Sequence, residues 1–545
     1  MRTQSADCVE YEYMGAHRAE CGGHTFRVFA PDAEQVFLVG DFCSWDEGIS
    51  MRRLPCFEVW EITVPDGIVH EGEKYKFKIF ERNETCYVAD PYAFASEGQH
   101  GNASAVCELG DYVWRDSGWL CYRQRKVSEH ASQPINIYEI DLGSWKHRPN
   151  GEFCAYGEIA RELAPYVKQM GYTHIALTPV MEYERDEGDI FDVRAYFAPT
   201  ARFGAPRDFK AFVDNMHEAG IGVILELELS KSALARLDPF VKDIESFFKS
   251  CVCFWVEEYH VDGICLNGVA DLAEHAFGGG RHEAIDFMGM VNSYLKNKFP
   301  DVLTLSLDVL DAQERKKLAA DMLPDTRWGE FMLDRVCKGT RTEDIIGVES
   351  MGIATEASLV AISHKDVRGE GRSFLDRMEG EHFQKFARVR ALMGYVMTCP
   401  GKKLTFMGVE IGQSCGWKRT SSMEWSVLGS DAHSRLQLYT ARLGSLYLST
   451  ECLYRGSFEL IDTGIQGLIC YRRAVENKEV IVFVNLTQTE YKNFRFETKC
   501  KVIFNSDEEC FGGEGIFDPK EDINDAEDEA DIRIPPLSVI IFDRV

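Results

Sequence analysis

Short stretches of alternating apolar and polar residues dominate the first 115 positions of the chain. Residues 59–64 and 75–80 alternate in this way, and residues 26–30 and 36–40 are two further short strand candidates. Gly, Pro and Asp separate the four segments at intervals of 10 to 20 residues. A period of two is typical of half-buried β-strands, because successive side chains point to opposite faces. Regularly spaced short strands of this kind predict a small β-sandwich over residues 1–115.

From residue 134 the pattern changes to apolar runs that alternate with segments of helical period. The strongest apolar runs predict buried strands at residues 135–140, 174–178, 223–227, 261–266 and 303–307. The segments between them predict helices at residues 156–170, 207–219, 240–258 and 282–298. Weaker strand candidates follow at residues 328–333, 358–363 and 404–408. Strands that alternate with helices build parallel sheets, so we expect a (β/α)8 TIM barrel over residues 116–450, with its chemistry at the C-terminal ends of the strands.

Short alternating strands return in the last part of the chain. Residues 467–471 and 479–484 are short, largely apolar segments of this kind. They predict a second all-β domain over residues 451–545. The expected fold is therefore of the α/β class, a barrel flanked by N-terminal and C-terminal β-sandwich domains.

The charge balance excludes some classes of partner. Lys and Arg number 60 against 88 Asp and Glu, which gives a formal net charge of −28. Nucleic acids and anionic membranes need a basic face, so we expect neither as a partner, whereas a neutral sugar is compatible with this charge. The chain shows no secretory signal and no apolar run long enough to span a membrane. Its 18 cysteines are scattered without a CxxC pair, so we expect a cytoplasmic protein with reduced thiols and no metal site.

Several strings along the chain resemble the glycogen (1,4-alpha-glucan) branching enzymes, members of the α-amylase superfamily. They are VGDFCSW (39–45), ADPYAF (89–94), PINIYEIDLGSW (134–145), YFAPTARFG (196–204), AGIGVIL (219–225), EEYHVDG (257–263), PGKKLTFMG (400–408) and, near the end of the chain, NSD (505–507) with FGG (511–513). The resemblance covers nearly the whole chain in order. It implies the same layout of sandwich, barrel and sandwich, and a first domain similar to a glycogen-binding module.

The resemblance also assigns three catalytic positions, and none of them carries a carboxylate here. Retaining glycoside chemistry needs a carboxylate nucleophile, a carboxylic acid that serves as acid and base, and a further carboxylate near the sugar. The three positions are occupied by Asn267, Leu307 and Lys365. An amide cannot form the glycosyl ester, and an alkyl group has no proton to give. An ammonium about 4 Å from a cationic transition state costs roughly 4 kcal/mol at an effective dielectric near 20, on the order of 10³ in rate.

Other positions of the expected cleft also depart from the family pattern. The arginine that orients the nucleophile is replaced by Cys265, and the stacking tyrosine corresponds to Phe191. The end of the third strand reads ELELSK (226–231), so the family's sugar-contacting histidine is missing, and the segment that follows is much shorter. His364 matches the family pattern.

Two alternatives to lost catalysis remain open. Asn267 precedes Gly268, and deamidation of an Asn-Gly pair would restore an aspartate at that position. Alternatively, Glu226, Glu228 and Asp366 form a new set of carboxylates for different chemistry. The competing interpretation is that these carboxylates are solvated or paired with lysines, for which Lys231 and Lys365 are candidates.

The N-terminal module has its own candidate ligand residues. Trp45, Lys76 and Tyr87 fall where a glycogen-binding module places its stacking aromatics and a lysine. Flat aromatic faces suit sugar rings, and an ammonium group donates to hydroxyls. We therefore expect Trp45, Lys76 and Tyr87 to form a glucan-binding set, with ordinary sandwich packing as the alternative.

These observations lead to one hypothesis and two alternatives. The hypothesis is a catalytically inactive branching-enzyme homologue that binds α-glucan or an enzyme of glycogen metabolism and acts as a regulator or scaffold. The first alternative is an active branching enzyme that transfers α-1,4 chains to 6-hydroxyls. The second alternative is a structural subunit whose barrel docks another protein. No cofactor is implied, and the sequence does not determine the oligomeric state.

Overall fold

The computed structural model describes most of the chain. The described residues are 9–55, 58–82, 84–98, 101–110, 112–126, 132–184, 192–324, 358–367, 372–465, 467–497, 500–519 and 529–544. Their contacts divide the chain into two compact units, residues 1–124, 141–164 and 177–321 in the first, and residues 125–140, 165–176 and 322–545 in the second.

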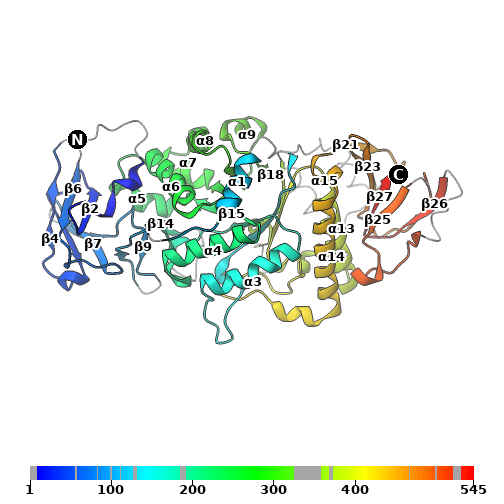
Figure 1. Cartoon of the computed structure of the whole chain (residues 1–545). Helices are drawn as coiled ribbons and strands as arrows, with labels where there is room; N and C mark the ends of the chain where they lie inside the picture. Colours follow the sequence, from blue (N-terminus) through cyan, green and yellow to red (C-terminus); the bar gives the residue numbers. More distant parts are fainter. Residues whose placement is uncertain are drawn as a thin grey trace. The chain divides into compact units, whose positions relative to one another are not determined.

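Two antiparallel sheets form the N-terminal part of the first unit (Figure 1). One has the order β1 (Gly15–Arg18), β2 (His24–Phe29), β6 (Val59–Val64), β5 (Arg52–Arg53). The other has the order β4 (Ile49–Ser50), β3 (Gln35–Gly40), β7 (Lys74–Glu81), β10 (Ser104–Ala105), β9 (Ala95–Ser96), and β8 (Glu84–Val88) also pairs with β7. Phe26 and Trp60 from the first sheet and Leu38 and Phe77 from the second are buried in one hydrophobic core. The predicted sandwich is thereby confirmed.

Eight parallel strands form the central sheet. They are β11 (Asn136–Ile140), β12 (His174–Leu177), β15 (Gly222–Glu228), β16 (Gly263–Asn267), β17 (Leu303–Leu305), β18 (Leu323–Pro324), β19 (Ser358–Ile362) and β20 (Lys402–Phe406). Their order is β17-β16-β15-β12-β11-β20-β19-β18, so the barrel is closed except between β17 and β18 in the part of the chain that the structure describes. The predicted barrel is confirmed, but the strand predicted at 328–333 lies outside the described residues.

The last strand of the barrel begins two residues earlier than its sequence pattern predicts. The expected strand is at 404–408, whereas β20 runs from Lys402 to Phe406 with Lys402 and Lys403 buried. Lys402 Nζ donates to the carbonyl oxygen of Gln133 (2.7 Å) and Lys403 Nζ to that of Cys399 (2.6 Å). Because both ammonium groups donate to backbone carbonyls, the strand tolerates them in the interior. Polarity alone would assign these two positions to a loop.

Helices follow the strands of the barrel. They are α1 (Ser117–Arg125), α2 (Leu142–Trp145), α3 (Tyr156–Gln169), α4 (Pro206–Glu218), α5 (Lys231–Leu237), α6 (Ile244–Tyr259), α7 (Val269–Ala276), α8 (Arg281–Lys298), α9 (Ala312–Leu318), α12 (His364–Val367), α13 (His382–Thr398), α14 (Asp431–Ser449) and α15 (Glu451–Arg455). Two further strands, β13 (Met181–Tyr183) and β14 (Val193–Pro199), pair with each other. In the described residues, no helix is both long enough and apolar enough to cross a bilayer.

A network of buried charges surrounds Asp262, the residue that precedes β16. Its Oδ1 accepts hydrogen bonds from Trp119 Nε1 (2.7 Å) and Arg123 Nη1 (2.9 Å), both on α1. Its Oδ2 accepts from the backbone N–H of Val223 (2.7 Å) and lies 2.8 Å from His217 Nε2. Four donors around one buried carboxylate tie α1 to the N-terminal ends of β15 and β16.

The other ring nitrogen of the histidine in this network faces a second aspartate. His217 Nδ1 lies 2.9 Å from Asp116 Oδ2, which also lies 2.8 Å from His260 Nδ1. Burial opposes the charged imidazolium, but the charge of Asp262 and the hydrogen bonds to both aspartates outweigh it and raise the pKa of His217 to about 9. Burial alone would raise the pKa of Asp262, yet the charges of His217 and Arg123 hold it well below its usual range.

The C-terminal strands form a second antiparallel β region, in the second unit. The larger sheet has the order β21 (Ser457–Ile461), β22 (Leu468–Val475), β23 (Lys478–Asn485), β27 (Ser538–Arg544), β25 (Cys500–Asn505), and β24 (Tyr491–Glu497) pairs with β26 (Glu529–Ile534). Phe483, Ile532, Ile540 and Phe542 belong to its core. Helix α13 packs closely against β27, because a Cβ at Gly394 would lie 2.6 Å from Val539 Cγ2.

Candidate functional site

The amide of Asn267 lies at the C-terminal end of β16, in a fully buried position. Its Oδ1 accepts a hydrogen bond from the backbone N–H of Leu307 (2.7 Å) and lies 3.5 Å from Ser306 Oγ. Its Nδ2 has no hydrogen-bond partner among the described residues. The positions that the family resemblance assigns to nucleophile and acid/base are therefore neighbours, joined by a side-chain-to-backbone bond.

The side chains of Leu307 and Asp308 have different surroundings. Leu307 is buried, with 5% of its surface exposed, and β17 ends two residues before it. Asp308 Oδ2 accepts hydrogen bonds from the backbone N–H groups of Gly268 (2.9 Å) and Val269 (3.1 Å) at the start of α7. A carboxylate at a helix N-terminus is stabilised by the orphan donors and by the helix dipole. The carboxylate that follows Leu307 in the sequence is thus engaged with a helix end.

Glycine is required between Asn267 and α7. Gly268 has a φ of 104°, and a Cβ there would lie 2.9 to 3.2 Å from backbone atoms of Leu229. This close approach brings the turn after β16 against the chain that follows β15. It fixes the Gly268 N–H that Asp308 accepts.

Two acidic residues of β15 lie beside β16. The register pairs Glu226 with Cys265 and Glu228 with Asn267. All four residues are buried, and Cys265 Sγ lies 3.7 Å from Asn267 Oδ1. The thiol that stands where the family has an arginine therefore contacts the amide. The cleft predicted around Glu226 and Cys265 consists of buried side chains on adjacent strands.

The lysines that we considered as partners for the new carboxylate set are engaged or exposed. Lys231 Nζ lies 2.5 Å from Glu274 Oε1 on the surface, so its carboxylate partner is Glu274. Lys365 is exposed on α12. Asp366 Oδ2 accepts from the backbone N–H and the hydroxyl of Ser363, each at 2.8 Å, which closes the turn at the start of α12.

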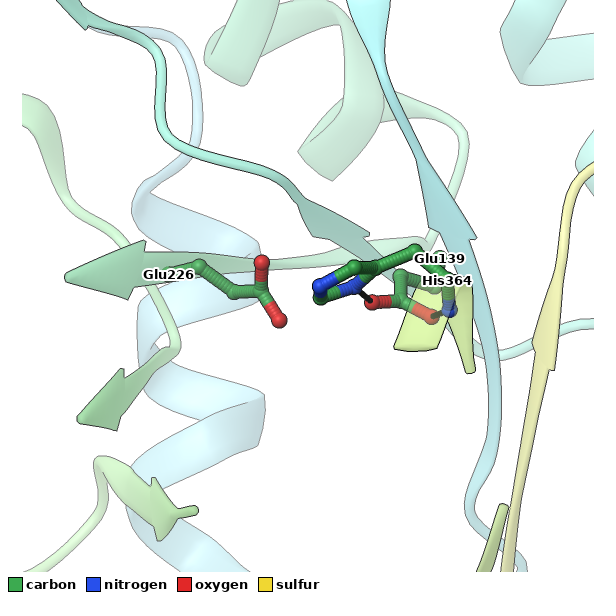
Figure 2. A group of neighbouring side chains, drawn as sticks. All are labelled: Glu139, Glu226 and His364. Atoms are coloured by element: carbon green, nitrogen blue, oxygen red, sulfur yellow. Dashed lines mark hydrogen bonds and ion pairs between the residues drawn. The ribbon is translucent and has the colours of Figure 1, made fainter. Parts of the chain in front are cut away.

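His364 is held by a buried glutamate that the sequence reading did not single out. His364 Nδ1 lies 2.5 Å from Glu139 Oε1, and its backbone N–H donates to Oε2 (2.9 Å), as Figure 2 shows. The signal for Glu139 was present, because it is the one acidic residue inside the apolar run of β11. A second such group is Glu410, whose Oε1 accepts from the hydroxyls of Tyr138 (2.7 Å) and Tyr166 (2.8 Å). Burial raises the pKa of Glu410, and these hydrogen bonds oppose the rise.

Carboxylate and imidazole groups are the donor types that hold metal ions in proteins. Glu139 and His364 are two groups of these types, and they are bonded to each other (Figure 2). In this structure the Nδ1 of His364 is used by Glu139. Phe191, the remaining predicted cleft residue, lies outside the described residues.

Of the predicted glucan-binding residues, Lys76 lies on β7 and Tyr87 on β8, and Trp45 lies in the turn between β3 and β4. Ser44 and Trp45 both have positive φ (51° and 62°), and Trp45 Nε1 donates to Asp41 Oδ1 (2.8 Å). Two consecutive left-handed residues are strained, a feature that clusters at binding sites. Tyr87 has 49% of its surface exposed, and Lys78 Nζ lies 5.8 Å from its ring centroid.

The third residue of this set is engaged. Lys76 Nζ is bonded to Asn102 Oδ1, and burial lowers the pKa of Lys76. Lys78 occupies the next outward position of β7, opposite Tyr87 in the register. The alternation along β7 places Lys76 and Lys78 on one face, so this pattern indicates Lys78 as well as the predicted Lys76.

Family models match three parts of the chain. Residues 13–93 match Carbohydrate-binding module 48 (Isoamylase N-terminal domain), residues 158–233 match the catalytic domain of alpha amylase, and residues 462–545 match the C-terminal all-beta domain of alpha amylase. The order of the three matches follows the order of the sandwich, the barrel and the C-terminal sheets.

Solved structures share the fold at low sequence identity. The catalytic module of the glycogen-degrading pneumococcal virulence factor SpuA superimposes with a TM-score of 0.75 at 13% identity, covering 98% of both chains. Pullulanase from Paenibacillus barengoltzii superimposes with a TM-score of 0.73 at 15% identity, covering 97% of this chain and 95% of the other. At these identities the likeness concerns the fold alone.

Curated relatives match almost the whole chain. The 1,4-alpha-glucan branching enzyme GlgB of Halothermothrix orenii is 32% identical over 623 residues, covering 99% of this chain and 97% of the relative. That of Nitrosomonas eutropha is 31% identical and covers 98% of this chain and 82% of the relative. Both alignments are longer than this chain, so the relatives carry segments that it lacks. On this identity and coverage, the chain belongs to the 1,4-alpha-glucan branching enzyme family.

Proposed function

We propose that this chain is a branching-enzyme homologue that has lost glycosyl transfer and acts in glycogen metabolism as a glucan-binding regulator or scaffold. The observation that carries the proposal is the pair formed by Asn267 and Leu307. A neutral amide stands at the end of β16, and its oxygen is bonded to the backbone of an apolar residue. Neither side chain can supply the nucleophilic carboxylate or the transferable proton that retaining chemistry needs.

The nearby carboxylates do not replace the missing groups. Asp308 is engaged with the N-terminus of α7, and Asp366 with the turn at Ser363. Each would have to give up two hydrogen bonds to charged acceptors, about 1.5–3 kcal/mol apiece, before it could reach a substrate. Glu226 and Glu228 are buried in β15, a strand that lies between two neighbouring strands of the sheet.

Deamidation of Asn267 is disfavoured by its surroundings. The reaction needs the Gly268 nitrogen to attack the side-chain carbonyl, which requires a mobile backbone and a free N–H. Here the residue is fully buried, its oxygen is bonded to Leu307, and the Gly268 N–H is bonded to Asp308. Peptide mass mapping of aged protein checks this point, because conversion at Asn267 would contradict it.

The N-terminal module supports the glucan-binding part of the proposal. Residues 13–93 match a carbohydrate-binding module, and the exposed Tyr87 ring lies near the Lys78 ammonium on the same face. Trp45 is fixed by its indole hydrogen bond to Asp41. Rings held in place on a β surface stack on sugars at low entropic cost.

The first experiment tests for catalysis. The purified full chain is incubated with amylose, and the iodine absorbance and chain-length profile are followed. We expect no change. A change that disappears in Asn267→Ala would refute the proposal in favour of the active branching enzyme. Restoring Asp, Glu and Asp at positions 267, 307 and 365 is expected not to recover full activity, since the relatives carry segments that this chain lacks.

The second experiment tests glucan binding by co-sedimentation with glycogen. We expect the wild-type chain to be retained and Trp45→Ala and Tyr87→Ala to be released. Tyr122→Ala is the matched control, because Tyr122 is also exposed (45%) but lies on α1, outside the module match. Absence of retention by the wild-type chain would favour the protein-docking subunit instead.

A further inference from the structure

A buried guanidinium without a partner lies on α13. Arg390 has only 4% of its surface exposed, and its side chain makes no hydrogen bond and no ion pair with the residues that the structure describes. Tyr439, whose hydroxyl donates to the Arg390 backbone carbonyl, packs beside it. Burial lowers the pKa of Arg390, although Tyr439 and Asp507 oppose this. Buried charges in native proteins are normally paired or bound to an ion, so this guanidinium requires an explanation.

Asp507 is the acidic residue whose charge acts on Arg390, but it does not neutralise the guanidinium. Asp507 Oδ1 accepts from the backbone N–H of Glu514 (3.0 Å), and Oδ2 accepts from that of Ile516 (2.6 Å) and, more weakly, from the next residue. The carboxylate is thereby turned toward the 514–517 segment. It acts on Arg390 only through its charge, at a distance beyond that of an ion pair.

A second arginine reaches the same turn from α14. A Cβ placed on Gly512 would lie 3.4 Å from Arg390 Nη1 and 3.7 Å from Arg435 Cδ. Gly512 has a φ of 83°, so the turn requires glycine there. Arg435 donates from Nη1 to the Glu509 carbonyl (3.1 Å), and its side chain is 46% exposed. Two guanidinium side chains therefore converge on one turn, one of them buried and the other open to solvent.

We propose that Arg390 and Arg435 bind a phosphate group, free or as a phosphomonoester, at the Gly512 turn. A planar guanidinium with its donors unused matches a tetrahedral oxyanion bidentately, and a second arginine favours a doubly charged anion over a carboxylate. The ligand would join α13, α14 and the turn around residues 509–513 within one unit. Its binding would raise the stability of that unit, because the folded form alone presents the site.

The experiment compares melting temperatures of the full chain in chloride and in inorganic phosphate at equal ionic strength and pH. We expect an upward shift that grows with phosphate concentration and saturates. Arg390→Gln is expected to melt higher than the wild type in chloride, because an unpaired buried charge is removed, and to lose the response to phosphate. Arg455→Gln is the matched control, since Arg455 forms an exposed helical ion pair with Glu451.

Two further variants keep the test decisive if Arg390→Gln does not fold. Arg390→Lys keeps the charge without the planar fork, and Arg435→Gln changes only the exposed side chain. Each substitution is expected to raise the dissociation constant for phosphate about tenfold, because one charge-assisted hydrogen bond is lost. Isothermal titration with phosphate measures this directly.

The ligand source is distinguished by separate titrations with inorganic phosphate, a hexose phosphate and acetate. A response to inorganic phosphate supports a site for the free anion, and a response to the hexose phosphate alone supports a phosphomonoester. A response to acetate equal to that for phosphate overturns the phosphate assignment. The proposal is also overturned if the wild type shows no response, or if Arg390→Gln and Arg435→Gln respond as the wild type does.

Discussion

The two ends of strand β16 are built in opposite ways. At the N-terminal end, Asp262 is buried as an anion and receives four hydrogen bonds, two of them from the charged side chains of Arg123 and His217. At the C-terminal end, Asn267 is just as buried but neutral, and its Oδ1 accepts from the backbone of Leu307. A buried charge is stable only where opposite charges and donors surround it. The strand therefore has a buried charge at its N-terminal end and a buried neutral amide at its C-terminal end.

Removing the charge at the N-terminal end should have the largest effect. Asp262→Asn leaves His217 and Arg123 without their common partner and turns an amide N–H toward existing donors. We expect a loss of about 3–5 kcal/mol in the free energy of unfolding, measured by urea denaturation at pH 7. Asp431→Asn serves as the control, because the Asp431 side chain is 91% exposed. A loss for Asp262→Asn below about 1 kcal/mol would remove the contrast between the two ends.

The same network predicts a pH dependence. The folded pKa of His217 is about 9, above the ordinary value near 6.5 that the unfolded chain has. The folded form thus binds the proton more tightly than the unfolded chain. The contribution of protonated His217 to the free energy of unfolding is therefore complete below about pH 6.5. It falls as the pH rises through about 9, by on the order of 3 kcal/mol. Urea titrations across this range measure the fall. In His217→Gln the fall should vanish, and an unchanged slope would show that another group titrates there.

A smaller loss is expected at the C-terminal end. Asn267→Ala leaves the buried N–H of Leu307 without its acceptor, which costs about 1–3 kcal/mol. Ser306→Ala should cost less, because Ser306 Oγ lies 3.5 Å from the amide oxygen and makes the weaker contact. Chemical denaturation of both variants decides the order. If Asn267→Ala costs as much as Asp262→Asn, the neutral end of β16 is as important to stability as the charged end.

The smallest effect is expected at Lys365. Lys365 is exposed on α12, and substitutions at exposed positions usually change stability by no more than about 0.5 kcal/mol. Lys365→Ala should therefore unfold at the same urea concentration as the wild type. A destabilisation beyond about 1 kcal/mol would mean that the lysine is part of the structure around His364, rather than a side chain that merely occupies the position of a carboxylate.

Much of the architecture could be predicted from local patterns. The apolar runs at 135–140, 174–178 and 223–227 correspond to β11, β12 and β15, because strands buried on both faces are nearly continuous in apolar residues. The pattern failed at Lys402 and Lys403, where buried ammonium groups bind backbone carbonyls, and it ran two residues past the end of β17. Polarity alone cannot reveal which charges find a buried partner.

The sequence by itself determined which chemical groups stand at three positions: an amide at 267, an alkyl group at 307 and an ammonium at 365. Only the tertiary structure decided what their neighbours do. It directs Asp308 to α7, Lys76 to Asn102 and Glu139 to His364. The reason is physical: residue identity sets the chemistry a side chain can perform, but the partner of a carboxylate or an ammonium is set by groups that folding brings near from distant parts of the chain.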